Sequence, residues 1–332
     1  MPPSVLITGA TGFLGGAVAR RLHALGWQVT ATGRNLNAGK SLQETGLSFH
    51  PCDLASETTA VRQLVAGNDS VVHCAALSSP WGKRRDFVAA NILATQNVIS
   101  ACVAEKVRRL VHISSPSVSF DYATLHDQNE AAPWIEPPAN HYIATKRIAE
   151  LLVCQAMQDG LPAIVLRPKA LIGPGDTTLL PSVLSVASRG TFPLFGPDCL
   201  LDLTAIDDAC QAVCLALETE ETGGTYHLTS GQPLSRKLVL ETIFRACHLT
   251  VKWKPLPLRG ALALGSTLEW CSRLLTLGNW EPPLTRYSVG ALGYGQTLDI
   301  SAARRDLNYM PNTNLLEILH ACGRLWKEAR AS

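Results

Sequence analysis

The amino-acid sequence predicts an α/β fold, in which a doubly wound parallel sheet carries a smaller C-terminal lobe. Short apolar runs rich in β-branched residues alternate with segments of helical periodicity through the first half of the chain. This alternation is typical of βαβ units, whose helices cover both faces of a parallel sheet. Beyond Arg167 the alternation weakens, and proline and glycine interrupt the sequence more often, which indicates a second lobe.

The elements are expected in a regular order along the chain. Strands are expected at 4–8, 28–33, 47–53, 70–76, 108–115 and 162–168. The main helices between them are expected at 14–26, 87–104 and 142–157. We therefore expect a first domain at residues 1–168 and a second lobe at residues 169–332, with helix 206–217 packing back on the sheet. In such an arrangement the cleft between the two parts holds the substrate.

Composition excludes several classes of function. The 332 residues include 29 basic and 27 acidic side chains, a net charge of +2, which gives no electrostatic reason to expect nucleic-acid binding. Hydrophobic residues make up 46% and charged residues 17%, so a sizeable core can form. The 10 cysteines contain no CxxC pair and lie near no histidine cluster, so no metal site is expected.

Localisation is expected to be cytoplasmic. The N-terminus lacks the basic, apolar and cleavage regions of a secretory signal, and free thiols suit a reducing compartment. The charge-free run at 87–104 contains Asn91, Gln96 and Asn97, which indicates a buried helix and no transmembrane segment. The apolar stretch at 260–278 is left open between a core helix, the wall of an apolar pocket and a membrane-surface contact.

A glycine-rich loop follows the first strand. In "TGATGFLGG", Gly9 permits a sharp turn, Gly12 permits close approach of a pyrophosphate, and Gly15 lets the next helix lie close to the sheet. Glycine spacing alone also fits an ordinary turn, but here it lies between a strand and a helix at the start of a βαβ series. The loop therefore predicts a Rossmann-type dinucleotide site.

The second strand indicates which dinucleotide is bound. No Asp or Glu lies between Thr8 and Gln43 to hold the ribose 2′-hydroxyl of NAD, and Arg34 stands where a 2′-phosphate would lie. The alternative for Arg34 is an exposed loop arginine. We expect NADP(H), with NAD(H) left open. Asp53 is placed to accept from the adenine amino group, or to cap the following helix.

Three polar side chains then follow in an order that suggests redox chemistry. The strand at 108–115 ends in hydroxyls, including Ser115, where ligands bind at the carboxyl edge of a parallel sheet. Tyr142 and Lys146 lie one helical turn apart on one face. A nearby ammonium lowers the pKa of a phenol and makes it a better acid–base group. Ser115 alone is more often a turn residue, and a YxxxK spacing alone is weak.

These motifs resemble the extended short-chain dehydrogenases/reductases, in the branch of the epimerases and 3β-hydroxysteroid dehydrogenases. The resemblance spans nearly the whole chain, through "TGATGFLGG", "NILATQNVI", "SSPSVSF", "YIATK" and "LRPKALIGPGD". Within the branch, "SSPSVSF" and the tail "EPPLTRYSV…LDISAARRDLNYMP" are similar to 3β-hydroxysteroid dehydrogenases and, more closely, to bacterial 2-alkyl-3-oxoalkanoate reductases. The segment "AALSSPWG" also fits the latter group. The chain departs from the family at "HCAA", where Asn-Ala is usual, and at Ala94, where glycine is usual.

The resemblance implies a role for each site residue. Tyr142 is the proton donor in reduction, Lys146 lowers its pKa and binds the nicotinamide ribose, and Ser115 orients the substrate oxygen. Asn91 would hold an active-site water. The alternative, that Asn91 is a structural polar residue of a buried helix, explains its position nearly as well. The expected cofactor-binding residues are Gly9, Thr11, Gly12, Phe13, Leu14, Gly15, Arg34, Asp53, Leu54, Ala75, Tyr142, Lys146 and Pro168.

The leading functional hypothesis is an NADP(H)-dependent oxidoreductase that interconverts a ketone and a secondary alcohol on a small apolar β-keto or β-hydroxy substrate. The alternatives are a 3β-hydroxysteroid dehydrogenase, a nucleotide-sugar epimerase, and a redox-sensing binding protein of the same fold. The resemblance also suggests a homodimer formed by helices 87–104 and 142–157.

Overall fold

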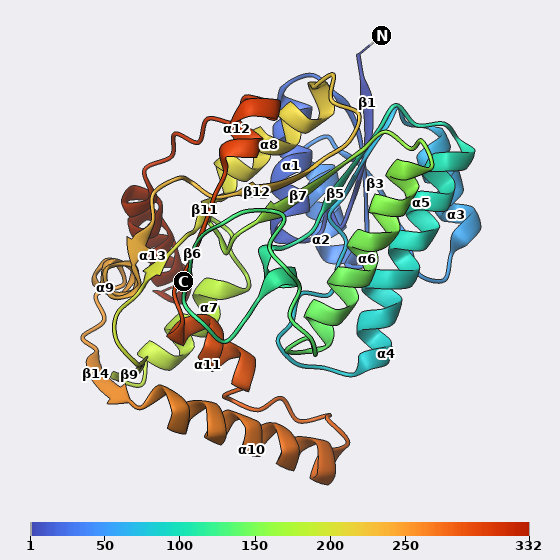
Figure 1. Cartoon of the computed structure of the whole chain (residues 1–332). Coiled ribbons are helices and arrows are strands. Elements are labelled where there is room, and N and C mark those ends of the chain that lie inside the picture. The colour runs from blue at the N-terminus through green and yellow to red at the C-terminus, as the bar shows by residue number, and fades with distance from the viewer. Residues whose placement is uncertain (1, 332) are drawn as a thin grey trace.

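The computed structural model describes residues 2–331 of the chain, with side chains to residue 328. Its centre is a parallel seven-stranded sheet of strand order β12-β7-β5-β4-β1-β2-β3 (Figure 1). The order reverses between β1 and β4, which is where an open α/β sheet forms a ligand crevice. The strands are β1 (Ser4–Thr8), β2 (Gln28–Gly33), β3 (Ser48–Pro51), β4 (Ser70–His73), β5 (Arg109–Ile113), β7 (Ala163–Pro168) and β12 (Thr225–Leu228).

Alternate side chains of each strand contribute to two separate cores, one on each face of the sheet. Val5 and Ile7 of β1 pack with α1 (Phe13–Ala24), α8 (Ile206–Glu218) and α12 (Ser301–Leu307). Leu6 packs on the other face, with α3 (Thr58–Ala66), α5 (Ala94–Ala104) and α6 (His141–Gln158). Helix α2 (Leu36–Glu44) contacts β2 and β3. The predicted doubly wound α/β sheet is therefore confirmed, because the two-residue periodicity of a strand requires a cover on both faces.

The helical stretch before β5 has a local irregularity. It runs through α4 (Arg84–Phe87), a π-helical segment (Val88–Leu93) and α5. By length and mean hydropathy, Arg84–Ala104 is the one helix of the described chain that could cross a membrane. Val98 and Cys102 are fully buried against the sheet, which is the packing of a core helix.

The second lobe has its own small sheets and helices. A four-stranded sheet has the order β13-β10-β15-β6, and β11-β8 and β14-β9 form two separate strand pairs. The strands are β6 (Leu125–Gln128), β8 (Leu171–Ile172), β9 (Thr191–Phe195), β10 (Leu200–Leu201), β11 (Thr204–Ala205), β13 (Leu234–Ser235), β14 (Lys252–Leu256) and β15 (Gln296–Leu298). The helices are α7 (Leu179–Ala187), α9 (Arg236–Ala246), α10 (Leu258–Thr276), α11 (Arg286–Gly293) and α13 (Leu315–Ala331).

Two segments cross the domain boundary expected at residue 168. Strand β6 lies before it in sequence but pairs with β15 of the second lobe. Strand β12 lies after it but pairs with β7 as the outermost strand of the main sheet, and α8 packs on β5 and β7. The chain therefore passes between the two parts several times, so the cleft between them is bordered by both.

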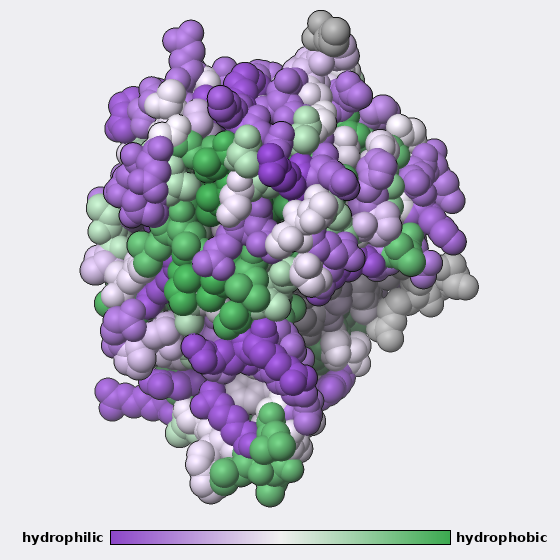
Figure 2. Space-filling view, turned by 90° about the vertical axis from the view of Figure 1, so that its right-hand side faces the viewer, coloured by the Kyte–Doolittle hydropathy of each residue, from purple (hydrophilic) through white to green (hydrophobic). Residues whose placement is uncertain are grey.

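Helix α10, whose sequence left three alternatives open, is not a core helix. It lies along the outside of the second lobe (Figure 1), and its buried residues are the small Ala261, Gly265 and Ser272. A Cβ at Gly265 would lie 2.8 Å from the backbone nitrogen of Arg286, so glycine allows the close approach to α11. Leu258 and Leu262 pack against the cluster of Phe195 and Val289. The large apolar residues Leu264, Trp270, Leu274 and Leu275 are exposed, and Figure 2 shows a hydrophobic projection at the lower end of the molecule, where α10 lies.

Candidate active site

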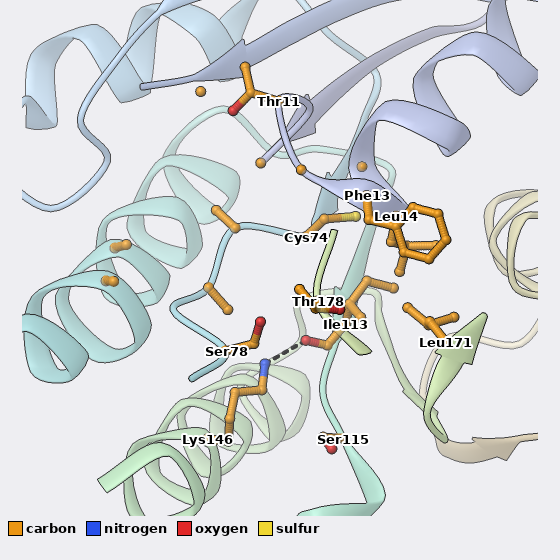
Figure 3. Close-up of a pocket in the computed structure, with 18 of the residues that line it drawn as sticks. Thr11, Phe13, Leu14, Cys74, Ser78, Ile113, Ser115, Lys146, Leu171 and Thr178 are labelled. Atoms are coloured by element: carbon orange, nitrogen blue, oxygen red, sulfur yellow. Dashed lines mark hydrogen bonds between the residues drawn. The ribbon is translucent and has the colours of Figure 1, made fainter. Parts of the chain in front are cut away.

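A cleft of about 490 Å³ opens at the carboxyl ends of the parallel strands, where the strand order reverses (Figure 3). Its walls are the glycine loop after β1, the loops after β2 to β5, the first turns of α6, and the segment after β7. Thr177, Thr178 and Leu179 close it from the second lobe. The volume falls within the range of small-molecule and cofactor sites.

The glycine loop has the backbone geometry that a pyrophosphate site needs. Gly9 has φ +66°, and a Cβ there would lie 2.7 Å from the backbone nitrogen of Ala75. A Cβ at Gly15 would lie 2.3 Å from the carbonyl oxygen of Gly9. Gly12 caps α1 without a side-chain hydrogen bond, so the positive end of the helix dipole remains open to an anion. The loop therefore fits a dinucleotide.

Arg34 and Asp53 line the same cleft, at the ends of β2 and β3. Arg34 is exposed and directly precedes Asn35, whose side chain caps α2 by accepting from Asn37 N and Ala38 N, each at 3.1 Å. The guanidinium therefore stands on an anchored turn. Asp53 does not cap a helix, because it closes a turn by accepting from Ala55 N at 3.1 Å, and α3 begins later, at Thr58.

The proposed catalytic residues converge in this cleft. Ser115 follows β5, and Tyr142 and Lys146 lie one turn apart on α6, and all three line the cleft. The Oγ atoms of Ser115 and Ser117 lie 2.7 Å apart. Lys146 Nζ donates to the carbonyl oxygen of Ile113 at 2.6 Å (Figure 3). Segments distant in sequence thus place a phenol, an ammonium and a hydroxyl together at the strand ends.

Burial has the largest effect on the pKa values of Lys146 and Tyr142. It lowers the pKa of Lys146 to about 8, although the carboxylate of Glu150 raises it in part. It also raises the pKa of Tyr142, against the lowering effect of hydrogen bonds from Ser115 and Ser117. In the protein alone, the pKa of Tyr142 therefore shifts opposite to the expected direction, because desolvation penalises the phenolate. The phenol therefore holds its proton at neutral pH, but it is a weaker acid than a free phenol.

A buried ion pair supports Lys146 from one turn further along α6. Arg167 Nε donates to Glu150 Oε2 at 3.1 Å, Arg167 Nη2 pairs with Oε1, and Ser114 Oγ also donates to this carboxylate. Glu150 and Arg167 are both buried. The carboxylate thus places a fixed negative charge near the Lys146 ammonium. The sequence analysis did not single out Glu150, although it lies eight residues after Tyr142 on the same helix face.

Asn91 lies outside the lining of the cleft. It is buried in the π-helical segment, and its Oδ1 accepts from Leu77 N at 2.7 Å. Its amide nitrogen donates to Leu77 O at 3.2 Å and to Thr145 Oγ1 at 3.0 Å. These contacts tie the loop after β4 to α6, which is a positioning role. The expectation that Asn91 takes part in catalysis stays a prediction.

The second lobe adds a tyrosine that the sequence analysis missed. Tyr287, on α11, packs edge-on against Phe120 with ring centroids 5.1 Å apart, and Ser117 forms a hydrogen bond with it. Tyr142, Ser115, Ser117 and Tyr287 therefore form a hydroxyl row at the border of the two parts. Tyr287 lies in the C-terminal segment that resembles the family, but no spacing in that segment assigns it to the site, because only the tertiary fold brings α11 beside the loop after β5.

All of the predicted cofactor-binding residues line the cleft, together with Cys74, Ala76 and Ser78. Their contact with a cofactor stays a prediction. Among the residues that the structure describes, no group of three or more His, Cys, Asp or Glu side chains could hold a metal ion. Burial raises the pKa of Cys74 to about 12, so this thiol is neutral in the cleft wall.

Comparison with known proteins agrees with this geometry. Residues 5–229 match the NAD dependent epimerase/dehydratase family. The chain is 34% identical to the 2-alkyl-3-oxoalkanoate reductase of Stenotrophomonas maltophilia, over 94% of this chain and 96% of that protein. It is 29% identical to the sterol-4-alpha-carboxylate 3-dehydrogenase, decarboxylating, of Saccharomyces cerevisiae, over 95% of each protein.

A solved structure shows the same fold. The UDP-glucuronic acid 4-epimerase from Bacillus cereus, in complex with NAD, superposes with a TM-score of 0.77 at 22% identity, over 98% of this chain and 99% of that one. The fold, the cleft and the family match agree with one another. The chain therefore belongs to the NAD dependent epimerase/dehydratase family, among the extended short-chain dehydrogenases/reductases, and is an NAD(P)-binding oxidoreductase.

Proposed function

We propose that this enzyme is an NADP(H)-dependent reductase that interconverts a ketone and a secondary alcohol on an apolar β-keto or β-hydroxy acid of the 2-alkyl-3-oxoalkanoate kind. The observation that carries the proposal is the convergence of Ser115, Tyr142 and Lys146 in a cleft whose other end holds Arg34. The similarity to a 2-alkyl-3-oxoalkanoate reductase over almost the whole chain supports the substrate class.

In the reductive direction, Ser115 donates a hydrogen bond to the carbonyl oxygen and holds it beside Tyr142. Lys146 would hold the nicotinamide ribose in the cleft, and a reduced nicotinamide bound there would supply the hydride for the carbonyl carbon. Tyr142, which holds its proton at neutral pH, donates that proton to the oxygen. The Lys146 ammonium stabilises the phenolate that remains. In the oxidative direction Tyr142 acts as the base.

NADP(H) is favoured over NAD(H) by the residues around Arg34. The end of β2 carries this exposed guanidinium, and the chain has no acidic residue from Thr8 to Gln43 that could hold a ribose 2′-hydroxyl. A guanidinium matches a phosphate in charge and in the geometry of its donors.

A 3β-hydroxysteroid dehydrogenase is the second candidate, because the chain also resembles a sterol-4-alpha-carboxylate 3-dehydrogenase along its length. Both candidates need an apolar substrate region. A nucleotide-sugar epimerase is less favoured, because a nucleoside diphosphate calls for several cationic contacts. Among the described residues, Arg34 and Lys146 are the cations that line the cleft, and both are assigned to the cofactor.

We further propose a homodimer and a cytoplasmic location. Helices α5 and α6 lie side by side and expose apolar side chains, with Val103 55% and Leu151 56% exposed. Pairing these helices with a second copy would bury this surface in a four-helix contact. All ten cysteines are free thiols, which suits a reducing compartment.

A cofactor-linked screen tests the proposed function. The purified enzyme is offered 2-alkyl-3-oxoalkanoic acids with NADPH or NADH, and 3β-hydroxysteroids or UDP-sugars with NADP⁺ or NAD⁺. We expect the highest kcat/KM for the β-keto acid with NADPH. Turnover confined to the steroids would favour the second candidate. Turnover of the UDP-sugars with tightly retained NAD⁺ would refute the proposal.

A further inference from the structure

The C-terminal end of α10 presents large apolar side chains to solvent. Leu275 is 81% exposed and Leu277 is 82% exposed, and Trp270, Leu274 and Trp280 are 63%, 58% and 43% exposed. We call these five residues the α10 tip. Leu275 and Leu277 can be this exposed only on a convex surface, and Figure 2 shows a hydrophobic projection at the lower end of the molecule, where α10 lies. Scattered exposed leucines are ordinary, but a contiguous group of this kind marks a contact surface.

The α10 tip is held in a fixed conformation. Helix α10 ends at Thr276, and the two residues that follow, Leu277 with φ +52° and Gly278 with φ +77°, are left-handed. Gly278 N donates to Ser272 O at 3.1 Å, and Trp280 N donates to Thr276 Oγ1 at 3.0 Å. These two hydrogen bonds stabilise the turn after α10, in which the apolar side chains of the tip remain exposed to solvent.

The loop after β4 supports the α10 tip. Trp81 Nε1 donates to Gly278 O at 3.2 Å, and the Arg273 guanidinium lies over the Trp81 ring, 5.3 Å from its centroid. The same loop lines the active-site cleft with Ala76 and Ser78. The tip therefore lies beside the loop that borders the cleft.

The surroundings of the α10 tip carry a small excess of cations. Segments 81–86 and 269–281 carry four cations against three anions. The cations are Lys83, Arg84, Arg85 and Arg273, and the anions are Asp86, Glu269 and Glu281. Arg84 and Arg273 both lower the pKa of His141, so both lie close to this side chain. The side chains of Arg85 and Arg273 are 78% and 62% exposed, and each lies in a long surface ion pair, with Asp86 at 3.5 Å and with Glu269 at 3.9 Å.

We propose that the α10 tip docks on the surface of a lipid bilayer that contains anionic phospholipids. Leucine side chains at the apex suit the acyl boundary, tryptophans suit the headgroup level, and arginines beside them suit lipid phosphates. Helix α10 does not span the membrane, because it carries Arg259, Glu269 and Arg273 and packs along α11.

A lipid surface fits the α10 tip better than a protein partner does. Five apolar side chains on a convex tip supply too little surface for a stable protein interface, which needs about 20–30 residues on each side. A second copy docked through a twofold axis would bring Arg84, Arg85 and Arg273 of both copies together, and like charges oppose that contact. A bilayer avoids both problems. It deforms around a small convex tip, and its anionic headgroups attract the arginines.

Flotation of the full-length enzyme with lipid vesicles tests this inference, and its result does not depend on the substrate. The vesicles are pure phosphatidylcholine, or phosphatidylcholine with about 30 mol% phosphatidylglycerol. We expect wild-type protein to float with the anionic vesicles, and less with neutral vesicles or at high salt. The double variant Leu275→Ser/Leu277→Ser should lower the vesicle-bound fraction by about tenfold or more.

The matched control is Leu36→Ser, which removes a leucine that is 58% exposed on α2, away from the α10 tip. It should float like wild type. Circular dichroism and NADPH binding report whether each variant is folded. Wild-type protein that floats with neither vesicle, or a tip variant that floats like wild type, would overturn the inference. Sedimentation equilibrium without lipid gives a third outcome: a dimer abolished by the tip variant, with no vesicle binding, would show a protein contact instead.

Discussion

Replacing Arg34 by alanine should convert an NADPH-preferring enzyme into one that barely distinguishes NADPH from NADH. Arg34 is exposed at the rim of the cleft, on the turn that Asn35 anchors, and faces the expected position of the adenine ribose. Its removal takes a fork of donors from the 2′-phosphate of NADPH. It takes nothing from NADH, which has a hydroxyl there.

The size of the effect follows from the number of bonds and their exposure. A hydrogen bond to a charged group contributes about 1.5–3 kcal/mol, and a bidentate guanidinium–phosphate pair contains two of them. Solvent screens the exposed side chain of Arg34, so we take the contribution of one such bond for the pair. About 1.5–3 kcal/mol corresponds to a loss of roughly 10–150-fold in NADPH affinity.

Fluorescence titration measures the Kd of both cofactors, and initial rates with each cofactor varied give the two KM values. Lys40→Ala is the matched control, because Lys40 is an exposed cation on the neighbouring helix α2 and does not line the cleft. It should weaken NADPH binding by less than about twofold, through long-range charge alone. Equal weakening of NADH and NADPH by Arg34→Ala, or no weakening of NADPH, would refute the role given to this side chain.

Further predictions concern the lysine, the glycine loop and the dimer. Lys146 loses its charge as pH rises through its pKa of about 8, so the reduction rate of the wild-type enzyme should fall over that range. The guanidinium of a Lys146→Arg variant stays charged, so the residual activity of this variant should not fall with pH in the same range. In Gly15→Ala the new Cβ would lie 2.3 Å from the Gly9 carbonyl oxygen, so this variant should have a Tm lower by roughly 2–6 °C and should bind NADPH more weakly. In Gly67→Ala no atom lies within 4 Å of the new Cβ, so Tm and NADPH binding should both stay at the wild-type values in thermal-shift assays. Leu151→Glu, at a position 56% exposed on α6, should turn the proposed dimer into a monomer in sedimentation experiments, and a wild-type monomer would refute that dimer.

Local patterns in the sequence predicted the parts of the fold that local physics determines. The first strand was predictable, because a strand that is buried on both faces has a continuous apolar sequence. The glycine loop was predictable, because a Cβ at Gly9 or Gly15 would clash with neighbouring backbone atoms. Strand β12 was missed, because Thr225–Leu228 is short and includes Tyr226 and His227, and its place depends on pairing with β7. Its strand character is a consequence of tertiary structure.

The site shows the same division. The sequence predicted the set Ser115, Tyr142 and Lys146, since their order follows from strand ends and helix spacing. Tyr287 was not predictable, because α11 meets this set only through the packing of the second lobe. The direction of the pKa shift of Tyr142 was also not predictable, because it depends on how completely the fold removes water from the phenol.

The most direct test of the account is single-turnover oxidation of NADPH by a 2-alkyl-3-oxoalkanoate in the Tyr142→Phe enzyme. We expect the rate to fall by about 10²–10⁴-fold, because the proton donor is gone, while the Kd for NADPH stays within about threefold of wild type. Tyr294→Phe, a half-buried tyrosine outside the cleft, should react at the wild-type rate. A Tyr142→Phe enzyme that transfers hydride within about tenfold of the wild-type rate would contradict the central claim, that Tyr142 protonates the substrate oxygen.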